Sequence, residues 1–195
     1  MLNKSEKLFG YWSCLLLVVA IGCNQVHVER PVGEVAPKPI LNSFVGKWEV
    51  QEESRKVLFR LSMTGTDSRL LCKTLSSGKS TRAPNTPTRT EAIQVRSIEN
   101  NYYFYLANEG ASDFSFFRAV IDSPSQFTIY PPIPDRFRQE VAAGRIGGRV
   151  INHDRNSTYT VRLQADDVAL RKILTKSPTR EWFESEGVVF SSTKE

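Results

Sequence analysis

Hydrophobic and polar residues alternate along much of the chain from Phe44 onward. In residues 56–64, every second position from Val57 to Met63 is apolar, and most of the positions between them are polar or charged. Residues 158–165 repeat the pattern. A period of two is typical of β-strands that bury one face. Further strands are predicted at 44–52, 69–75, 91–99, 102–108, 114–121, 127–130, 149–152 and 188–192.

Two short helices are predicted late in the chain. In the first, Phe137 and Val141 share a face at a spacing of four residues, and Gly144 is suited to the helix end. The second begins at the carboxylates of residues 166–167, which are favourable at a helix amino terminus. A brief third turn is expected at residues 182–183.

The strands follow one another at short intervals, separated by polar turns, as in antiparallel barrels and sandwiches. Hairpin succession and late helices that cap one end favour a barrel. We therefore predict a mainly β (β-rich α+β) fold, with an antiparallel barrel of about 8–10 strands and two or three short helices late in the chain. Residues 43–195 are expected to form one domain of ordinary globular composition.

The amino-terminal segment has the pattern of a secretory signal. Two lysines lie within residues 1–7, and residues 8–22 form a stretch of 15 residues without charge. A membrane-spanning helix needs about 20 predominantly apolar residues, so this core is short for a span. We predict that residues 1–22 are a cleaved signal peptide. An uncleaved membrane anchor and secretion without lipid are the two alternatives.

The residues Ala20-Ile21-Gly22-Cys23 resemble the lipobox of bacterial lipoproteins. Gly22 and Cys23 match that motif, whereas Ala20 stands where the family prefers leucine. The resemblance implies cleavage between Gly22 and Cys23, fatty acylation of Cys23, including an amide-linked chain such as palmitate, and attachment to a membrane of the bacterial cell envelope. Asn24 after the cysteine implies sorting to the outer membrane, with the domain on the periplasmic or extracellular side. Two or more acyl chains would hold the protein durably.

Residues 23–42 are predicted to be a lipidated, proline-rich tether. They contain Pro31, Pro37 and Pro39, several charges and no extended apolar periodicity. Proline-rich segments stay extended and act as spacers. The segment is therefore expected to hold the folded domain away from the membrane surface.

The residues Phe44-Val45-Gly46-Lys47-Trp48 resemble the Gly-x-Trp opening of lipocalins and fatty-acid-binding proteins. In those families the tryptophan of the first strand closes the base of the barrel. The resemblance implies that Gly46 permits a close approach and that Trp48 fills the base. Two helices between strands depart from the lipocalin plan. As a whole, the exported domain is similar to uncharacterised bacterial lipoproteins with a lipocalin-like barrel.

Charge and cysteine content narrow the choice of partners. The net charge is +5, and the basic residues are scattered over the chain, which argues against a nucleic-acid binder and favours mild attraction to anionic lipid headgroups. Cys72 is the one cysteine inside the predicted domain, and Cys23 would be acylated, so no intramolecular disulfide is expected. Its position in an apolar strand favours a buried thiol over a reactive one.

No catalytic constellation is found in the sequence. His27 and His153 are the only histidines, and neither has metal-ligand spacing to cysteine or another histidine. The Gly-x-Ser-x-Gly motif of hydrolases is absent. We therefore predict no enzyme, no metal and no cofactor.

Aromatic residues are dense in two neighbouring strands, 102–108 and 114–121. Tyr103, Tyr105 and Phe117 are candidates to line a ligand cavity, and cross-strand aromatic pairing that stabilises the sheet is the alternative. Two functions follow. The first is a membrane-tethered barrel that binds a small apolar or amphipathic ligand. The second is a solid-core envelope protein that docks a protein partner, whose identity the sequence does not give.

Overall fold

The structure is a computed structural model and describes residues 24–52, 55–64, 68–77, 90–108, 110, 112–153, 158–175 and 181–193. The strands are β1 (Gln25–Val28), β2 (Glu34–Val35), β3 (Gly46–Glu52), β4 (Arg55–Thr64), β5 (Arg69–Ser77), β6 (Thr90–Ile98), β7 (Asn101–Ala107), β8 (Phe114–Ser123), β9 (Gln126–Tyr130), β10 (Gly148–His153), β11 (Thr158–Leu163) and β12 (Val188–Ser192). The helices are α2 (Lys38–Phe44), α3 (Pro134–Ala142) and α4 (Val168–Thr175).

Eight strands close an antiparallel barrel in the order β8-β7-β6-β5-β4-β3-β12-β9, and β9 returns to β8. Six of these pairs, from β3–β4 to β8–β9, join strands that follow one another in the chain. The carboxy-terminal strand β12 lies between β3 and β9 and so completes the closure. The predicted fold class is confirmed, and the closed antiparallel barrel is consistent with a lipocalin-like architecture.

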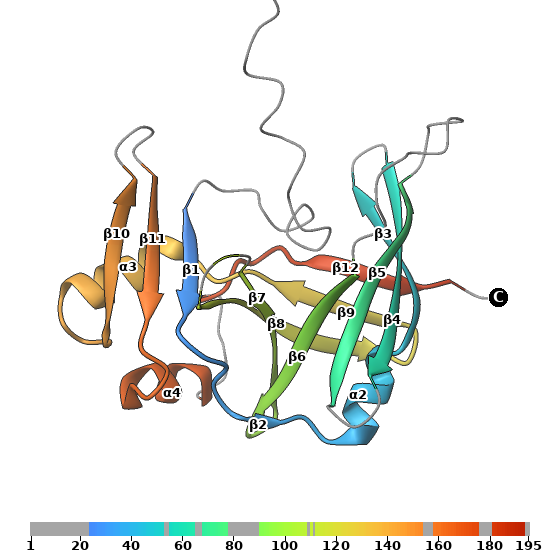
Figure 1. The fold of residues 1–195 in the computed structure, drawn as a ribbon, viewed down its shortest axis with the longest axis horizontal. Coiled ribbons are helices and arrows are strands. Elements are labelled where there is room, and N and C mark those ends of the chain that lie inside the picture. Colours follow the sequence, from blue (N-terminus) through green and yellow to red (C-terminus); the bar gives the residue numbers. More distant parts are fainter. Residues whose placement is uncertain are drawn as a thin grey trace, which may run out of the picture.

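A three-stranded extension leaves the barrel at β8 (Figure 1). The start of β8, at Phe114 and Ser115, pairs with β1, whereas its later part, from Arg118 to Ser123, pairs with β9. Strand β1 then pairs in parallel with β11, and β11 pairs antiparallel with β10. Strand β8 therefore belongs to both the barrel and the extension.

The inside of the barrel is packed with aromatic side chains. The ring of Phe44, from the end of α2, meets Phe104 at 4.8 Å and Phe127 at 5.2 Å between centroids. Trp48 contacts Phe127 edge to face at 4.6 Å. Leu41 and Phe44 of α2 are buried in this core, so the helix covers one end of the barrel.

A second hydrophobic core lies on the outer face of β7 and β8. Residues alternate between the two faces of a strand, so Tyr105 and Phe116 point away from the barrel interior. The Phe116 ring packs edge to face on Phe137 of α3 at 6.0 Å. Residues from β1, β11 and α4 complete this core, namely Val26, Val28, Tyr159, Val161, Leu163, Leu170 and Leu174.

The structure does not agree with an extended tether over residues 24–42. Val26 and Val28 are buried, and β1 is an inner strand of the extension. Pro37 and Pro39 occupy the N-cap and first turn of α2, where a missing N–H is tolerated. The prolines therefore mark the start of a helix. The alternation of polar and apolar residues in β1 covers only four residues, which is too short to predict a strand.

Helices α3 and α4 confirm the two helices predicted late in the chain. Residues 181–182 form the expected turn, after which Phe183 pairs with Pro132 in an isolated bridge. Helix α2 was not predicted. Within the described ranges, no helix has the length and hydropathy required to cross a membrane.

Candidate functional site

The proposed cleavage and lipidation residues, Gly22 and Cys23, lie outside the described residues. Gly46 and Trp48 begin β3 next to the capping helix. The Trp48 indole is buried and its Nε1 donates to the Phe44 carbonyl at 2.8 Å. A Cβ at Gly46 would lie 3.6 Å from Trp48, which is an ordinary contact, so glycine is favoured here by the φ of +150° rather than by close approach.

The three candidate ligand-lining residues do not share one surface. Phe117 belongs to the barrel core, whereas Tyr103 and Tyr105 belong to the second core on the other face of the sheet. Both tyrosines are fully buried, and their hydroxyls donate to the carbonyls of Leu174 at 2.7 Å and Val32 at 3.3 Å. Burial raises the pKa of both phenols well above the usual value. The aromatic faces that were expected to line a cavity are therefore buried against protein.

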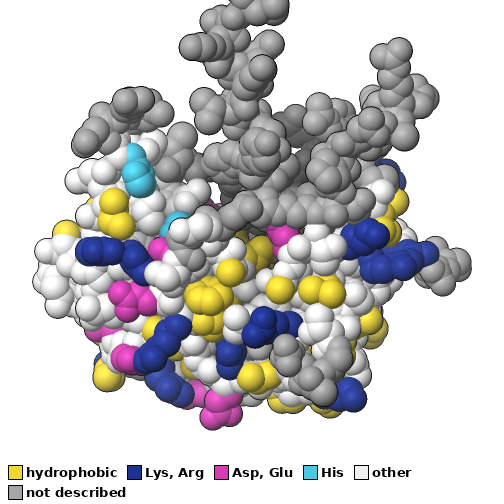
Figure 2. Space-filling view, in the orientation of Figure 1, with side chains coloured by type: hydrophobic (Ala, Val, Ile, Leu, Met, Phe, Trp, Pro, Cys, Tyr) yellow, Lys and Arg dark blue, Asp and Glu magenta, His cyan; other side chains and the backbone are white. Residues whose placement is uncertain are grey.

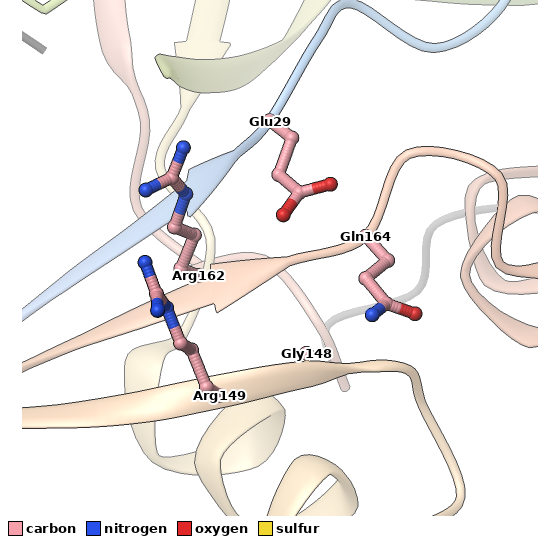
Figure 3. Close-up of a pocket in the computed structure, with 5 residues that line it drawn as sticks. All are labelled: Glu29, Gly148, Arg149, Arg162 and Gln164. Carbon is pink, nitrogen blue, oxygen red and sulfur yellow. The ribbon is translucent and has the colours of Figure 1, made fainter. Parts of the chain in front are cut away.

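A polar pocket lies instead on the outer surface of the extension. Its volume is about 290 Å³, and it is lined by Glu29, Gly148, Arg149, Arg162 and Gln164. Figure 3 shows both guanidinium groups on one side of the pocket, with the Glu29 carboxylate and the Gln164 amide on the other side. The site is therefore charged, open and unrelated to the barrel interior.

Neighbouring strands place these side chains. Arg149 of β10 and Arg162 of β11 are directly opposite each other in the antiparallel register. Glu29 follows the end of β1, and its backbone N–H donates to the Leu163 carbonyl at 3.1 Å. Alternation sends Val161 and Leu163 into the second core, so Arg162 points outward. The buried face of β11 thus fixes the direction of the charged one.

Arg162 is held from behind by polar groups around the buried Asp113. Its Nε lies 3.6 Å from Asp113 Oδ2, and its Nη2 donates to Ser112 Oγ at 3.1 Å. Asp113 is 7% exposed and also accepts from Asn108 Nδ2 at 2.8 Å. His27 Nδ1 lies 3.5 Å from Asp113 Oδ1 on the opposite side. The carboxylate therefore orients both the guanidinium and the imidazole.

His27 is kept neutral chiefly by burial, which holds its pKa below the usual value, although Asp113 acts in the opposite direction. Its Nε2 and Gln25 Oε1 form a hydrogen bond of 3.0 Å. His153 Nε2 lies 3.0 Å from Thr160 Oγ1 on the same sheet. Figure 2 shows both histidines, with basic and acidic side chains, over β10, β11 and β1.

Two arginines, a glutamate and a glutamine supply the chemistry of this pocket. In the part of the chain that the structure describes, no group of three or more His, Cys, Asp or Glu side chains is placed to hold a metal ion. Cys72 lies on β5, and its thiol is buried in the barrel core, as predicted. It is therefore not a solvent-exposed nucleophile. Two outward guanidinium groups are suited to recognising an oxyanion, because their planar donors match carboxylate and phosphate geometry.

Sequence reasoning did not select the residues of this pocket. A signal for one pair was present, since the predicted strands 149–152 and 158–165 are neighbours in sequence, as in a hairpin, and Arg149 lies opposite Arg162 in the antiparallel register. Glu29 and Asp113 carry no local signal, because β1 and the start of β8 reach β11 through pairings that are distant in sequence.

The fold and the site together define a closed antiparallel barrel with a charged pocket on an external sheet extension. No protein-family model matches the chain, and no curated protein or solved structure shows significant similarity to it.

Proposed function

We propose that this protein is a bacterial lipoprotein of the lipocalin-like kind, held at a membrane of the cell envelope by acyl groups on Cys23. The outer membrane is the favoured location, with the domain on the periplasmic or extracellular side. The lipobox-like residues support the anchor, and the closed barrel agrees with the lipocalin-like interpretation of Gly46 and Trp48. The domain acts as a solid interaction module that docks a protein partner on its outer surface.

The packed barrel interior is the observation that carries this proposal. Small barrels either fill with side chains or enclose one ligand. Here the interior is occupied by Phe44 from α2 and by a set of aromatic rings in mutual contact, and their side chains are almost fully buried. A barrel of this kind supports surface binding better than carriage of an apolar ligand.

The free edge of β10 supplies a surface for docking. Among the described strands, β10 pairs only with β11 and stands at the end of the sheet order. All but one of its residues are exposed, the exception being the half-buried Val150. An exposed edge offers unpaired backbone N–H and C=O groups to which an extended segment of a partner adds as a further strand.

Native mass spectrometry of the full protein, extracted from membranes in detergent, tests the filled barrel. We expect the mass of the acylated chain alone. A co-purified apolar molecule that survives release from the micelle would overturn the solid-core proposal and restore the ligand carrier.

Photo-crosslinking in living cells tests the docking edge. A photoreactive amino acid is placed at Ile151 on β10 and, as a control, at Val168 on α4, which is 81% exposed. We expect one discrete protein adduct from position 151 and none from position 168. Equal adducts from both positions, or none, would exclude β10 as the docking edge.

Labelling with radioactive palmitate tests the anchor. We expect incorporation into the native protein and none into Cys23→Ser. Equal labelling of the two forms would refute lipidation at this residue.

A further inference from the structure

The pocket on the extension contains two like charges on facing positions of the sheet. Arg149 and Arg162 are directly opposite on adjacent strands, an arrangement that destabilises a sheet when both side chains carry the same charge. Among the residues the structure describes, Arg149 makes no hydrogen bond or ion pair. Arg162 is paired with Asp113 at 3.6 Å, so, within the described residues, Arg149 is the member of the pair that lacks an anion.

Arg162 is already oriented for such an anion. Its Nη2 donates to Ser112, and its Nε lies 3.6 Å from Asp113 Oδ2, an ion pair beyond hydrogen-bond distance. A guanidinium has five N–H donors, so several remain on the side that lines the pocket. Its side chain is 20% exposed, whereas Arg149 is open to solvent, so one arginine is fixed and the other is adjustable. Preorganisation of this kind reduces the entropy lost on binding.

The opposite wall of the pocket carries the complementary charge. Glu29 is exposed and, within the described ranges, makes no ion pair with either arginine. Figure 3 shows its carboxylate directed into the pocket from just after the end of β1, between the guanidinium groups and Gln164. A ligand with only negative groups would meet this carboxylate, whereas a ligand that also carries an ammonium group would pair with it.

Gly148 lines the pocket with its backbone alone, and a side chain at this position would point toward the second core. A Cβ at Gly148 would lie 2.5 Å from the carbonyl oxygen of Arg162, so no larger residue fits without displacing the strand. The volume of about 290 Å³ is at the lower end of the range for ligand sites, which run from about 300 to 1,000 Å³. The occupant is therefore small.

We propose that this pocket binds a small zwitterion, with its carboxylate or phosphate on Arg149 and Arg162 and its ammonium group on Glu29. The same chemistry occurs in free aminoalkyl phosphates and in the headgroups of ethanolamine lipids. Asn24 and Glu29 are separated by five residues, which span about 17 Å of extended strand. The proposed anchor precedes Asn24, so the pocket lies away from the point of attachment to the membrane. This step rests on the proposed function. Because lipid headgroups are held at the membrane, the free molecule is the ligand.

Isothermal titration of the full protein in detergent tests the inference, with O-phosphoethanolamine as the zwitterion and with inorganic phosphate and ethanolamine as the single-charge controls. We expect saturable binding of O-phosphoethanolamine, at least tenfold weaker binding of phosphate, and no detectable binding of ethanolamine. Affinity should fall as salt is raised. No saturable binding of O-phosphoethanolamine up to about 10 mM would overturn the inference.

Variants separate the two ends of the ligand. Arg149→Gln should weaken binding of O-phosphoethanolamine at least tenfold, and Arg171→Gln on α4 should leave it unchanged. Glu29→Gln should weaken the binding of O-phosphoethanolamine, whereas the affinity for inorganic phosphate should stay the same or rise. Weakening of both ligands by Glu29→Gln would refute the ammonium contact. Unchanged melting temperatures would show that each variant is folded.

A lipid arm distinguishes the two sources of the headgroup. Vesicles of phosphatidylcholine with and without phosphatidylethanolamine are added as competitors to the titration. We expect no competition from either. Competition by the vesicles with phosphatidylethanolamine, and none by those of phosphatidylcholine alone, would overturn the assignment to a free ligand. None of these outcomes bears on the solid barrel or its docking edge, which the mass and crosslinking experiments test separately.

Discussion

Replacing Phe127 by alanine is the most direct test of a packed barrel. The Phe127 ring is 1% exposed and stacks on Phe190 with centroids 4.6 Å apart. It also makes edge contacts with Trp48 and Phe44. Phe→Ala in a packed core costs about 3–5 kcal/mol, and each good aromatic pair adds about 0.5–1.5 kcal/mol beyond the area buried. We therefore expect a loss of about 5 kcal/mol in the free energy of unfolding, at the top of that range.

Urea unfolding of the full chain in detergent, followed by tryptophan fluorescence and circular dichroism, measures this loss. Trp48 contacts the deleted ring and reports on the barrel core, whereas Trp182 packs against the second core. The expected fall in melting temperature is about 10–20 °C, at about 2–4 °C for each kcal/mol in a domain of this size. Phe127→Leu, which leaves a smaller cavity, should lose less and remain folded.

A matched control is Val189→Ala on the neighbouring strand β12, where the side chain is 41% exposed and a change within about 0.5 kcal/mol is expected. A loss below about 1 kcal/mol for Phe127→Ala would mean that the ring lies in a roomy or hydrated interior. That result would contradict the packed barrel on which the proposed function depends.

Three further predictions concern the extension. The unfolding free energy should fall as pH drops below about 6.5, because the lowered pKa of His27 leaves the folded chain with fewer bound protons than the unfolded chain. Urea titrations at several pH values measure this dependence, and His27→Gln should make it weaker. Burial, with hydrogen bonding to Asp135, raises the pKa of Tyr159 to about 12, so the free energy of unfolding should fall as pH rises from 10 to 12. In unfolding curves recorded over that interval, Tyr159→Phe should lose less of this free energy than the native protein. Deleting residues 24–28 removes β1 and exposes the second core, so the truncated chain should bind a hydrophobic dye and have a lower melting temperature. An unchanged melting temperature would show that β1 is dispensable.

The barrel was predictable because its strands carry their own signals. Alternation in 56–64 predicted β4 and alternation in 158–165 predicted β11, and both form with nearly the expected bounds. The helices at Phe137 and after residues 166–167 also appear. In each case local periodicity and capping agree with the tertiary environment, so no distant contact was needed to find them.

The second core was not predictable from local pattern. The aromatic residues on both faces of β7 and β8 predicted that one face is buried. For the other face, they were compatible both with a ligand cavity and with aromatic pairing that stabilises the sheet. That other face is covered by β1, α3 and α4, which come from segments far away in sequence. Tyr103 and Tyr105 are consequently buried, and the pocket residue Glu29 reaches Arg162 only because β1 joins the sheet beside β11.

The parallel pairing of β1 with β11 has a consequence for biogenesis. The Tyr159 N–H donates to the Asn24 side chain, across 135 positions of sequence. A chain that emerges amino terminus first therefore carries an apolar strand whose partner has yet to be delivered, and contacts of such long range slow folding. If the chain is exported amino terminus first, as the proposed function implies, Val26 and Val28 stay exposed until β11 has crossed the membrane, and a chaperone that covers this segment in the meantime would prevent aggregation.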